Sequence, residues 1–277
     1  MIVSLKAILD EAKKNNYGVA AANVFDMNTV KAVYEVASEL RAPIIINCHE
    51  KFDMELIGEI TRYYDKKYPE VVVALNLDHG SKFESAVIAI KSGFTSVMVD
   101  RSKKPFEDNV YETKEIVKMA HAVGVSVEAE LGHVGKGIEY KESKNNLLTE
   151  PLEALDYVNK TSVDCLAIAI GTAHGQYVGE TVIDYDRLEK IRDTVPIPLV
   201  LHGGSSTGDE NLKKAVDLGI SKINLFTDLI VNSANEIKKH IGEQPNTNFI
   251  NIIDEGIVGY KDMLKHYICL FGSQNRY

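Results

Sequence analysis

Short apolar runs alternate with longer amphipathic stretches along the whole 277-residue chain. The runs are nearly continuous, as in Ile44–Ile46, which is typical of parallel strands buried on both faces. Eight such runs predict the following strands: Gly18–Asn23, Pro43–Cys48, Val71–Leu77, Ser96–Val99, Ser126–Leu131, Cys165–Ile170, Leu199–His202 and Lys222–Leu225.

The amphipathic stretches between these runs predict helices. Gly93, Gly124 and Gly219 each stand where a helix ends before a strand. A first helix follows Ser4, and the others are Thr29–Leu40, Met54–Tyr68, Lys82–Ser92, Phe106–Val123, Pro151–Thr161, Tyr185–Thr194, Asp209–Leu218, Asp228–Ile241 and Ile252–Phe271. The alternation predicts a single-domain α/β (β/α)8 TIM barrel over residues 1–277, with C-terminal helices within 228–271. A doubly wound open sheet is the alternative.

One segment departs from the pattern. Residues 132–149 are polar, contain glycine and are too long for a plain connection. Loops of this length in compact domains are often mobile lids over active sites, and a surface excursion without function is the alternative.

Composition narrows the class of protein. The net charge is −9 and no basic block is present, so we expect no nucleic-acid partner. No apolar run is long enough to cross a membrane, and the first residues lack the apolar stretch of a signal peptide. The three cysteines form no CxxC pair. We therefore expect a cytoplasmic protein.

Three of the eight histidines occupy similar places. His79, His174 and His202 each lie at or just after the end of a predicted strand, and each stands beside glycine. Active sites of TIM barrels form at this rim, and three imidazoles with an open fourth position make a catalytic zinc site. A single histidine at a strand end is more often structural, whereas three at one rim favour a metal site.

Carboxylate side chains are also expected at or near this rim. Asp78 adjoins His79 and is a candidate acid/base, with a role in orienting a histidine as the alternative. Glu128 and Glu130 share one face of a strand by the period of two, where a charge is costly unless it is paired or near a metal. We favour Glu130 as a metal-proximal group. Asp100, at the end of the fourth strand, fits the same reasoning.

The loops after the seventh and eighth predicted strands indicate a phosphate site. Glycines let backbone N–H groups approach a phosphate, and a helix N-terminus adds positive potential. The residues concerned are Gly203, Gly204, Ser205, Asn224 and Thr227. Gly175 offers a further amide. Together these features suggest a Lewis acid acting on a phosphorylated carbonyl compound.

Five motifs resemble those of the class II fructose-bisphosphate and tagatose-bisphosphate aldolases: LDHG, VEAELG, AIGTAHGQY, LVLHGGS and KINLFTD. They run in family order over nearly the whole chain. The resemblance implies a homodimer or homotetramer acting on a phosphorylated sugar, and cleavage of a ketose 1,6-bisphosphate or related ketose 1-phosphate to dihydroxyacetone phosphate and an aldehyde.

The resemblance also implies roles for single residues. It assigns Zn²⁺ to His79, His174 and His202, with Glu130 near the metal, and makes Asp78 the acid/base at the C4 hydroxyl. The residues expected to bind substrate are Asn23, His49, Gly175, Gly203, Gly204, Ser205, Asn224 and Thr227. A monovalent cation, Na⁺ or K⁺, is expected near the phosphate. An acid on the loop after the fifth strand would protonate the carbanion, for which Glu139 is the first candidate and Glu142 the second.

Several positions depart from the family pattern. His49 stands where a serine is usual, Asn76 replaces a common histidine, and Arg101 and Phe226 replace smaller or polar residues. Ile257 and Cys269 stand where basic residues are common. We therefore expect that the aldehyde differs from glyceraldehyde 3-phosphate and is read by His49 or Arg101, unless these changes are drift. A non-catalytic phosphosugar-binding protein, or an isomerase or epimerase using an enediolate, are the alternative functions.

Overall fold

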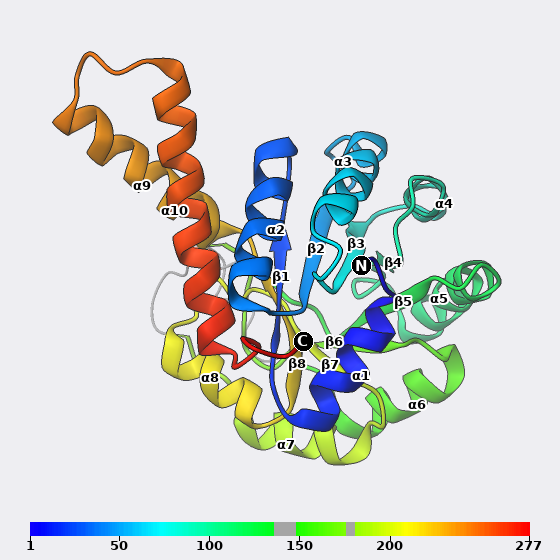
Figure 1. Cartoon of the computed structure of the whole chain (residues 1–277). Helices are drawn as coiled ribbons and strands as arrows, with labels where there is room; N and C mark the ends of the chain where they lie inside the picture. Colours follow the sequence, from blue (N-terminus) through cyan, green and yellow to red (C-terminus); the bar gives the residue numbers. More distant parts are fainter. Residues whose placement is uncertain (136–147, 176–180) are drawn as a thin grey trace.

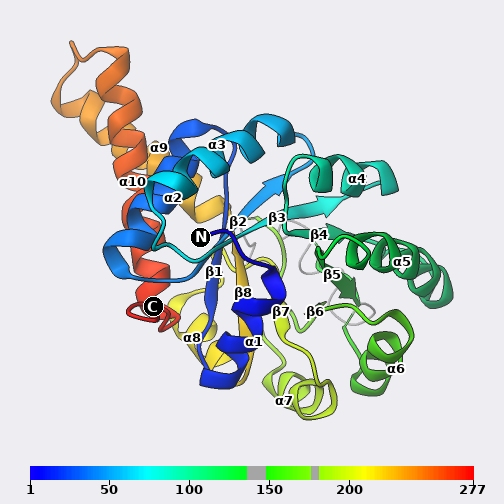
Figure 2. The ribbon, with the colours of Figure 1, turned by 45° about the vertical axis from the view of Figure 1, so that its right-hand side comes forward.

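Eight parallel strands form a closed barrel in sequence order, which excludes the open sheet (Figures 1 and 2). The computed structural model describes residues 1–135, 148–175 and 181–277. The strands are β1 (Val19–Asn23), β2 (Ile44–His49), β3 (Val73–Gly80), β4 (Ser96–Val99), β5 (Ser126–Leu131), β6 (Cys165–Ile168), β7 (Leu199–Leu201) and β8 (Ile220–Leu225). The predicted TIM barrel is confirmed.

Helices surround the barrel, and their bounds agree with the sequence pattern to within two or three residues. They are α1 (Leu5–Asn15), α2 (Met27–Leu40), α3 (Met54–Lys67), α4 (Phe83–Lys91), α5 (Phe106–His121), α6 (Pro151–Thr161), α7 (Tyr185–Thr194), α8 (Asp209–Asp217), α9 (Thr227–Glu243) and α10 (Phe249–Leu270). In the described part of the chain, no helix is long and apolar enough to cross a membrane.

Helix α1 closes one end of the barrel. Its apolar face, which includes Leu5 and Leu9, packs against inward-facing residues of several strands, among them Ala21, Ile45 and Ala74. Because side chains alternate between the two faces of a strand, the neighbouring Ile44 and Ile46 point outward to the core shared with the helices. The end that α1 covers is apolar and filled, so a ligand site has to lie at the other end.

Two residues further along β1, β2 and β3, the barrel interior becomes polar. Ala21 is followed on the same face by Asn23, Ile45 by Asn47, and Ala74 by Asn76 and then Asp78. Asn23 pairs in register with Asn47, and Asn47 with Asn76. A layer of buried polar side chains therefore crosses the barrel above its apolar base, and these groups require partners inside it.

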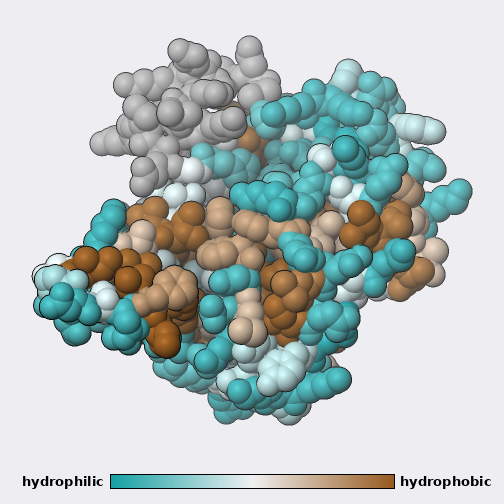
Figure 3. Space-filling model, turned by 90° about the horizontal axis from the view of Figure 1, so that it is seen from above, coloured by the Kyte–Doolittle hydropathy of each residue, from teal (hydrophilic) through white to brown (hydrophobic). Residues whose placement is uncertain are grey.

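Helices α9 and α10 form a pair that extends away from the barrel (Figures 1 and 2). The pair is tied to the barrel by the hydroxyl of Tyr260, which donates a hydrogen bond to the backbone oxygen of Asn23 at 2.9 Å. Hydrophobic side chains gather along the projecting arm (Figure 3), where Ile241, Phe249 and Ile250 are exposed. The arm therefore offers an apolar surface that the described chain does not cover.

The close approach of α9 and α10 requires a glycine. A Cβ at Gly259 would lie 2.8 Å from the backbone oxygen of Asn232. We expect Gly259→Ala to lower the free energy of unfolding by about 1–3 kcal/mol, since backbone atoms would have to move. Urea unfolding measures this change.

Gly242→Ala is the matched control. A Cβ at Gly242, also in α9, meets no atom within 4 Å, so alanine should stabilise the helix by up to about 1 kcal/mol. Equal effects of the two substitutions would contradict the proposed packing.

Candidate active site

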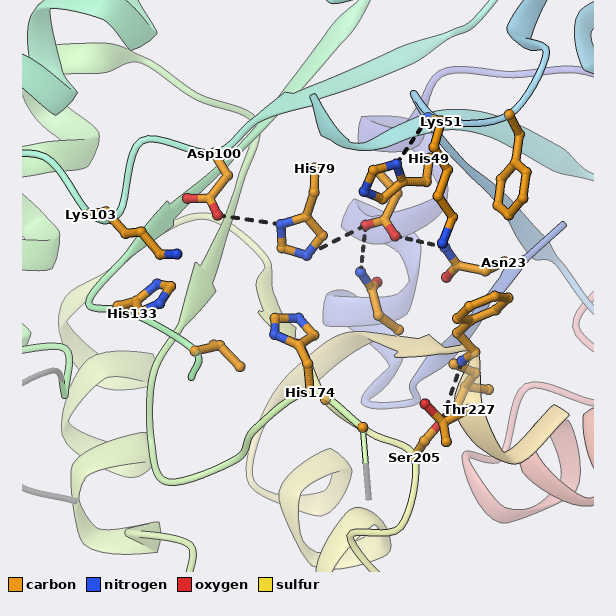
Figure 4. Close-up of a pocket in the computed structure, with 18 residues that line it drawn as sticks. Asn23, His49, Lys51, His79, Asp100, Lys103, His133, His174, Ser205 and Thr227 are labelled. Carbon is orange, nitrogen blue, oxygen red and sulfur yellow. Dashed lines mark hydrogen bonds and ion pairs between the residues drawn. The ribbon is translucent and has the colours of Figure 1, made fainter. Parts of the chain in front are cut away.

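A cavity of about 460 Å³ opens at the carboxyl ends of the strands, a size suited to a small-molecule ligand. Figure 4 shows the side chains that line it. They come from the ends of β1, β2, β3 and β8 and from the segments that follow β2, β4, β5, β6, β7 and β8. The barrel thus gathers groups from distant parts of the sequence around one space.

The structure brings His79, His174 and His202 together. Their ring centroids lie 4.7 to 5.8 Å apart. One ring nitrogen of each lies within 4.8 Å of the others. We refer to these three side chains as the imidazole cluster.

An irregularity in β3 lets two neighbouring residues face the same space. The register between β3 and β4 shifts between Leu77 and Gly80, and His79 has a φ of +53°. This left-handed conformation is uncommon for a residue with a side chain and marks functional sites. As a result, both Asp78 and His79 line the pocket, although neighbours on a regular strand point to opposite faces.

The imidazole cluster fits a divalent metal ion. Among the described residues, the buried Nε2 of His174 has no hydrogen-bond partner, and neither has the buried Oε2 of Glu130. Nδ1 of His202 and Nε2 of His79 face each other at 2.9 Å. Buried polar atoms without a hydrogen-bond partner cost free energy, and a bound metal ion would remove that cost. Three converging imidazole nitrogens with one side open are the ligand set of catalytic zinc.

Asp78 is held as an anion at the edge of the cluster. Asn23 and Asn224 donate hydrogen bonds to its two carboxylate oxygens at 2.7 and 3.0 Å. Burial alone would raise the pKa of Asp78, but the positive charges of His79, His202 and Lys222 hold it well below its usual value. The carboxylate is therefore ionised and positioned to accept a proton.

The imidazoles of the cluster differ in their electrostatic surroundings. Burial disfavours the charged form of His79, yet the nearby carboxylates, Asp78 first, raise its pKa to about 9. Burial and the two neighbouring rings lower the pKa of His174 to about 4. His174 is therefore neutral near pH 7, which is the state that binds a metal.

A buried ion pair supports His202 from below. Nζ of Lys222 lies 2.6 Å from Oε2 of Glu128, and Oε1 of Glu128 lies 2.8 Å from Nε2 of His202. All three side chains are fully buried. Because Glu128 engages Nε2, it leaves Nδ1 of His202 directed at His79. Carboxylates that orient metal-binding histidines in this way also fix their tautomer.

Glu130 and Asp100 flank the other side of His79. Oδ2 of Asp100 lies 3.4 Å from Nδ1 of His79. One oxygen of Glu130 accepts from the backbone N–H of Val134 at 3.0 Å, and the other lies 3.5 Å from His202. Glu130 thus lies beside the imidazole cluster, where the sequence expected it.

The loops that the sequence indicated as a phosphate site, after β7 and β8, lie on the side of the pocket opposite Asp100 (Figure 4). Gly175, Gly203, Ser205 and Thr227 all line the pocket, and Thr227 begins the 17-residue helix α9. Gly203 has a φ of +69°, and a Cβ there would lie 2.3 Å from a backbone oxygen. Only glycine fits so tight an approach, and the helix N-terminus supplies positive potential for an anion.

Two further residues singled out in the sequence, Gly204 and Asn76, do not line the pocket in the described chain. The backbone N–H of Gly204 donates to the backbone oxygen of Asn224 at 3.2 Å. Asn76 is buried in the barrel, where it donates to Asn47. Glu139 and Glu142 lie outside the described residues, as does most of the expected loop 132–149.

The structure places His49 and Arg101, the two residues expected to read the aldehyde, differently. His49 lines the pocket, but Arg101 does not line it among the described residues. The guanidinium of Arg101 pairs with Glu112 and donates to the backbone oxygen of Ser81 at 3.0 Å. Lys51 lines the pocket instead. Arg101 is thus held by Glu112 and Ser81 and does not face the pocket in the described chain, so a role in reading the aldehyde stays a prediction that this geometry does not support.

Three cations of the site were not predicted from the sequence: Lys222 below the imidazole cluster, and Lys51 and Lys103 at the pocket wall. A signal for Lys222 was present, since a lysine within a buried barrel strand needs a carboxylate partner, and Glu128 lay on another strand. No sequence signal distinguished Lys51 from other surface lysines.

Comparison with known proteins identifies the family. The family model for class II fructose-bisphosphate aldolase matches residues 3–276. The chain belongs to this family. The aldolase is 39% identical to a fructose-bisphosphate aldolase of Thermus caldophilus over the full length of both chains, and 38% identical to one of Geobacillus stearothermophilus over 88% of each.

Solved structures agree with this assignment. The aldolase resembles the YdjI aldolase from Escherichia coli K12 with a TM-score of 0.85 and 30% identity, covering 100% of this chain and 99% of that one. Membership makes the chain an aldehyde-lyase, a carbon–carbon lyase. This decides against the isomerase and the non-catalytic binding protein that the sequence left open.

The buried ion pair yields a stability prediction. Lys222→Met should lower the free energy of unfolding of the metal-free aldolase by about 3–5 kcal/mol, because Glu128 would remain as an unpaired buried charge. Urea unfolding measures this loss, and Lys222→Met combined with Glu128→Gln should recover part of it.

Lys239→Met serves as the control, because Lys239 is 64% exposed in a surface pair with Glu236. Such pairs contribute less than about 1 kcal/mol. A loss for Lys222→Met as small as that of the control would show that the pair is not needed.

Proposed function

We propose that this aldolase reversibly cleaves a ketose 1-phosphate, or a ketose 1,6-bisphosphate of the fructose or tagatose type, to dihydroxyacetone phosphate and an aldehyde. One observation carries the proposal. An ionised carboxylate, the imidazoles of His79 and His174 and a glycine-rich loop at a helix N-terminus line the same pocket, and the third imidazole, His202, is buried directly beside them. These are the groups needed to move a proton, polarise a carbonyl and bind a phosphate.

The proposed metal is Zn²⁺, held by His79, His174 and His202. The unpaired nitrogen of His174 and the facing nitrogens of the other two rings support this assignment. Bound there, the ion supplies a Lewis acid for the C2 carbonyl oxygen of the substrate. Glu130 lies close enough to the cluster to act as a further metal-proximal group.

Asp78 is the proposed acid/base. In cleavage, its carboxylate takes the proton of the C4 hydroxyl and the C4–O bond becomes a carbonyl. The C3–C4 bond breaks, and its electron pair stays on the dihydroxyacetone phosphate part. A proton must then be delivered to C3, for which Glu139 remains the predicted donor. In condensation, Asp78 returns its proton to the new C4 oxygen.

The loops after β6, β7 and β8 are the proposed site for the 1-phosphate. Gly175, Gly203, Ser205 and Thr227 come from these three loops and line one wall. The hydroxyl of Ser205 accepts from the backbone N–H of Asp228 at 3.2 Å, which fixes it at the start of α9. A monovalent cation beside the phosphate stays a prediction.

Asn23 and Asn224 complete the proposed site by holding Asp78. A cytoplasmic location and assembly into homodimers or homotetramers are further proposals. The exposed apolar side chains of the α9–α10 arm, Phe249 and Ile250 among them, support assembly, because exposed apolar patches mark contact surfaces.

Asp78→Asn should lower the rate of cleavage by about 10²–10⁴-fold, because the C4 hydroxyl would lose its proton acceptor. His174→Ala should abolish both zinc binding and cleavage. Release of dihydroxyacetone phosphate, measured with a coupled reductase, and zinc content of the purified protein check the two outcomes.

Asp217→Asn, at the exposed end of α8, is the control and should leave the rate unchanged. Full activity of His174→Ala, or cleavage that resists removal of the metal by a chelator, would refute the proposed mechanism.

A further inference from the structure

The loop after β2 places a cation at the pocket wall. Nζ of Lys51 lies 4.9 Å from the ring centroid of Phe52 and 5.4 Å from that of Phe226. All three residues line the pocket. Contacts of this kind attract the ammonium to the faces of the two rings. Lys51 is therefore drawn toward a point between the loops after β2 and β8, although it belongs to an exposed loop.

The described chain does not neutralise this cation. Arg101 pairs with Glu112, and Lys222 pairs with Glu128, whereas Lys51 has no carboxylate partner in the ranges that the structure describes. Lys103 also lines the pocket, but it lies beside Asp100, on the side away from Lys51 (Figure 4). The protein carries a net charge of −9, so acidic groups are plentiful elsewhere. An unpaired ammonium at the wall of a ligand pocket is available to a negatively charged group of the ligand.

The carboxylates that line the pocket are already engaged. Asp78 accepts hydrogen bonds from Asn23 and Asn224. Asp100 faces His79 and accepts from the backbone N–H of the residue two positions later. Neither carboxylate forms an ion pair with Lys51 in the described chain.

His49 adds a neutral donor beside Lys51. Its Nδ1 accepts a hydrogen bond from the backbone N–H of Lys51 at 3.1 Å (Figure 4). Because a backbone N–H can only donate, Nδ1 is the acceptor and the ring proton lies on Nε2. Burial lowers the pKa of His49, which keeps the ring neutral near pH 7. No described residue accepts from this Nε2–H.

The position of this pair relates it to one end of the substrate. His49 and Asp78 are direct neighbours in the register of β2 and β3. If Asp78 serves the C4 hydroxyl, as the proposed function requires, the carbons beyond C4 continue past Asp78 toward the loop after β2. The phosphate loops with Ser205 and Thr227 hold the other end.

We propose that Lys51 and the Nε2–H of His49 form a subsite for an anionic group, a phosphate or a carboxylate, on the aldehyde half of the substrate. The inference rests on the proposed function, because that function sets the direction of the substrate in the pocket. It replaces Arg101 with Lys51 as the residue that selects the aldehyde.

The test is condensation of dihydroxyacetone phosphate with three aldehydes by the zinc-loaded enzyme. The aldehydes are glyceraldehyde 3-phosphate, succinic semialdehyde and neutral glyceraldehyde, so that the two anionic probes distinguish phosphate from carboxylate. Lys51→Gln should lower kcat/KM for the preferred anionic aldehyde by about tenfold to a hundredfold, the loss expected for a charge-assisted hydrogen bond. The value for glyceraldehyde should change little, and Lys51→Arg should restore most of the loss.

Lys82→Gln is the control, since Lys82 is exposed and does not line the pocket. Retained turnover of glyceraldehyde by Lys51→Gln shows that the variant is folded. Equal losses for all aldehydes, no loss for any, or a wild-type enzyme that does not prefer an anionic aldehyde would overturn the subsite alone. Absence of condensation with every aldehyde would overturn the proposed function, and the subsite with it.

Discussion

A fully buried carboxylate, Glu128, stands between an ammonium and an imidazole, and the active end of the barrel depends on that arrangement. Lys222 satisfies one oxygen of Glu128 and His202 the other. An unpaired charge at this depth would cost several kcal/mol. Glu128 lies in β5, Lys222 in β8 and His202 directly after β7, so the barrel must close in this register before the charges can meet.

The same constraint sets the limits of the pocket. Below the polar layer, α1 packs against apolar residues such as Ala21 and Ile45 and leaves no space for a ligand. Above it, the imidazoles converge, Nε2 of His174 has no hydrogen-bond partner among the described residues, and Asp78 is fixed by two amides. The protein therefore holds its chemical groups rigidly at one level of the barrel, while the loops above that level contact the two ends of the ligand.

Much of this arrangement could be predicted from the sequence, because it follows from local periodicity. Continuous apolar runs such as Ile44–Ile46 placed the strands, and residues at strand ends such as His202 and Asp78 pointed to the rim of the barrel. The glutamates of β5 were assigned to one face by the period of two, which the structure bears out, since both lie near His202.

What the sequence did not reveal depends on irregular backbone or on contacts between distant segments. The shift in β3 and the left-handed conformation of His79 have no signature in Leu-Asp-His-Gly that periodicity can detect. The sequence also could not show which cation has a carboxylate partner. Arg101 pairs with Glu112 from the following helix, whereas Lys51 lies over aromatic rings from two loops. Only tertiary structure decides which positive charge is left for the ligand.

The central claim is that the imidazole cluster and the phosphate loops together activate C3 of dihydroxyacetone phosphate. Proton NMR of dihydroxyacetone phosphate incubated with the zinc-loaded enzyme in D₂O, with no aldehyde present, tests it most directly. We expect one of the two C3 hydrogens to be replaced by deuterium, and we expect His174→Ala not to catalyse this exchange. Retention of both hydrogens in the presence of the zinc-loaded enzyme would show that these groups do not activate C3.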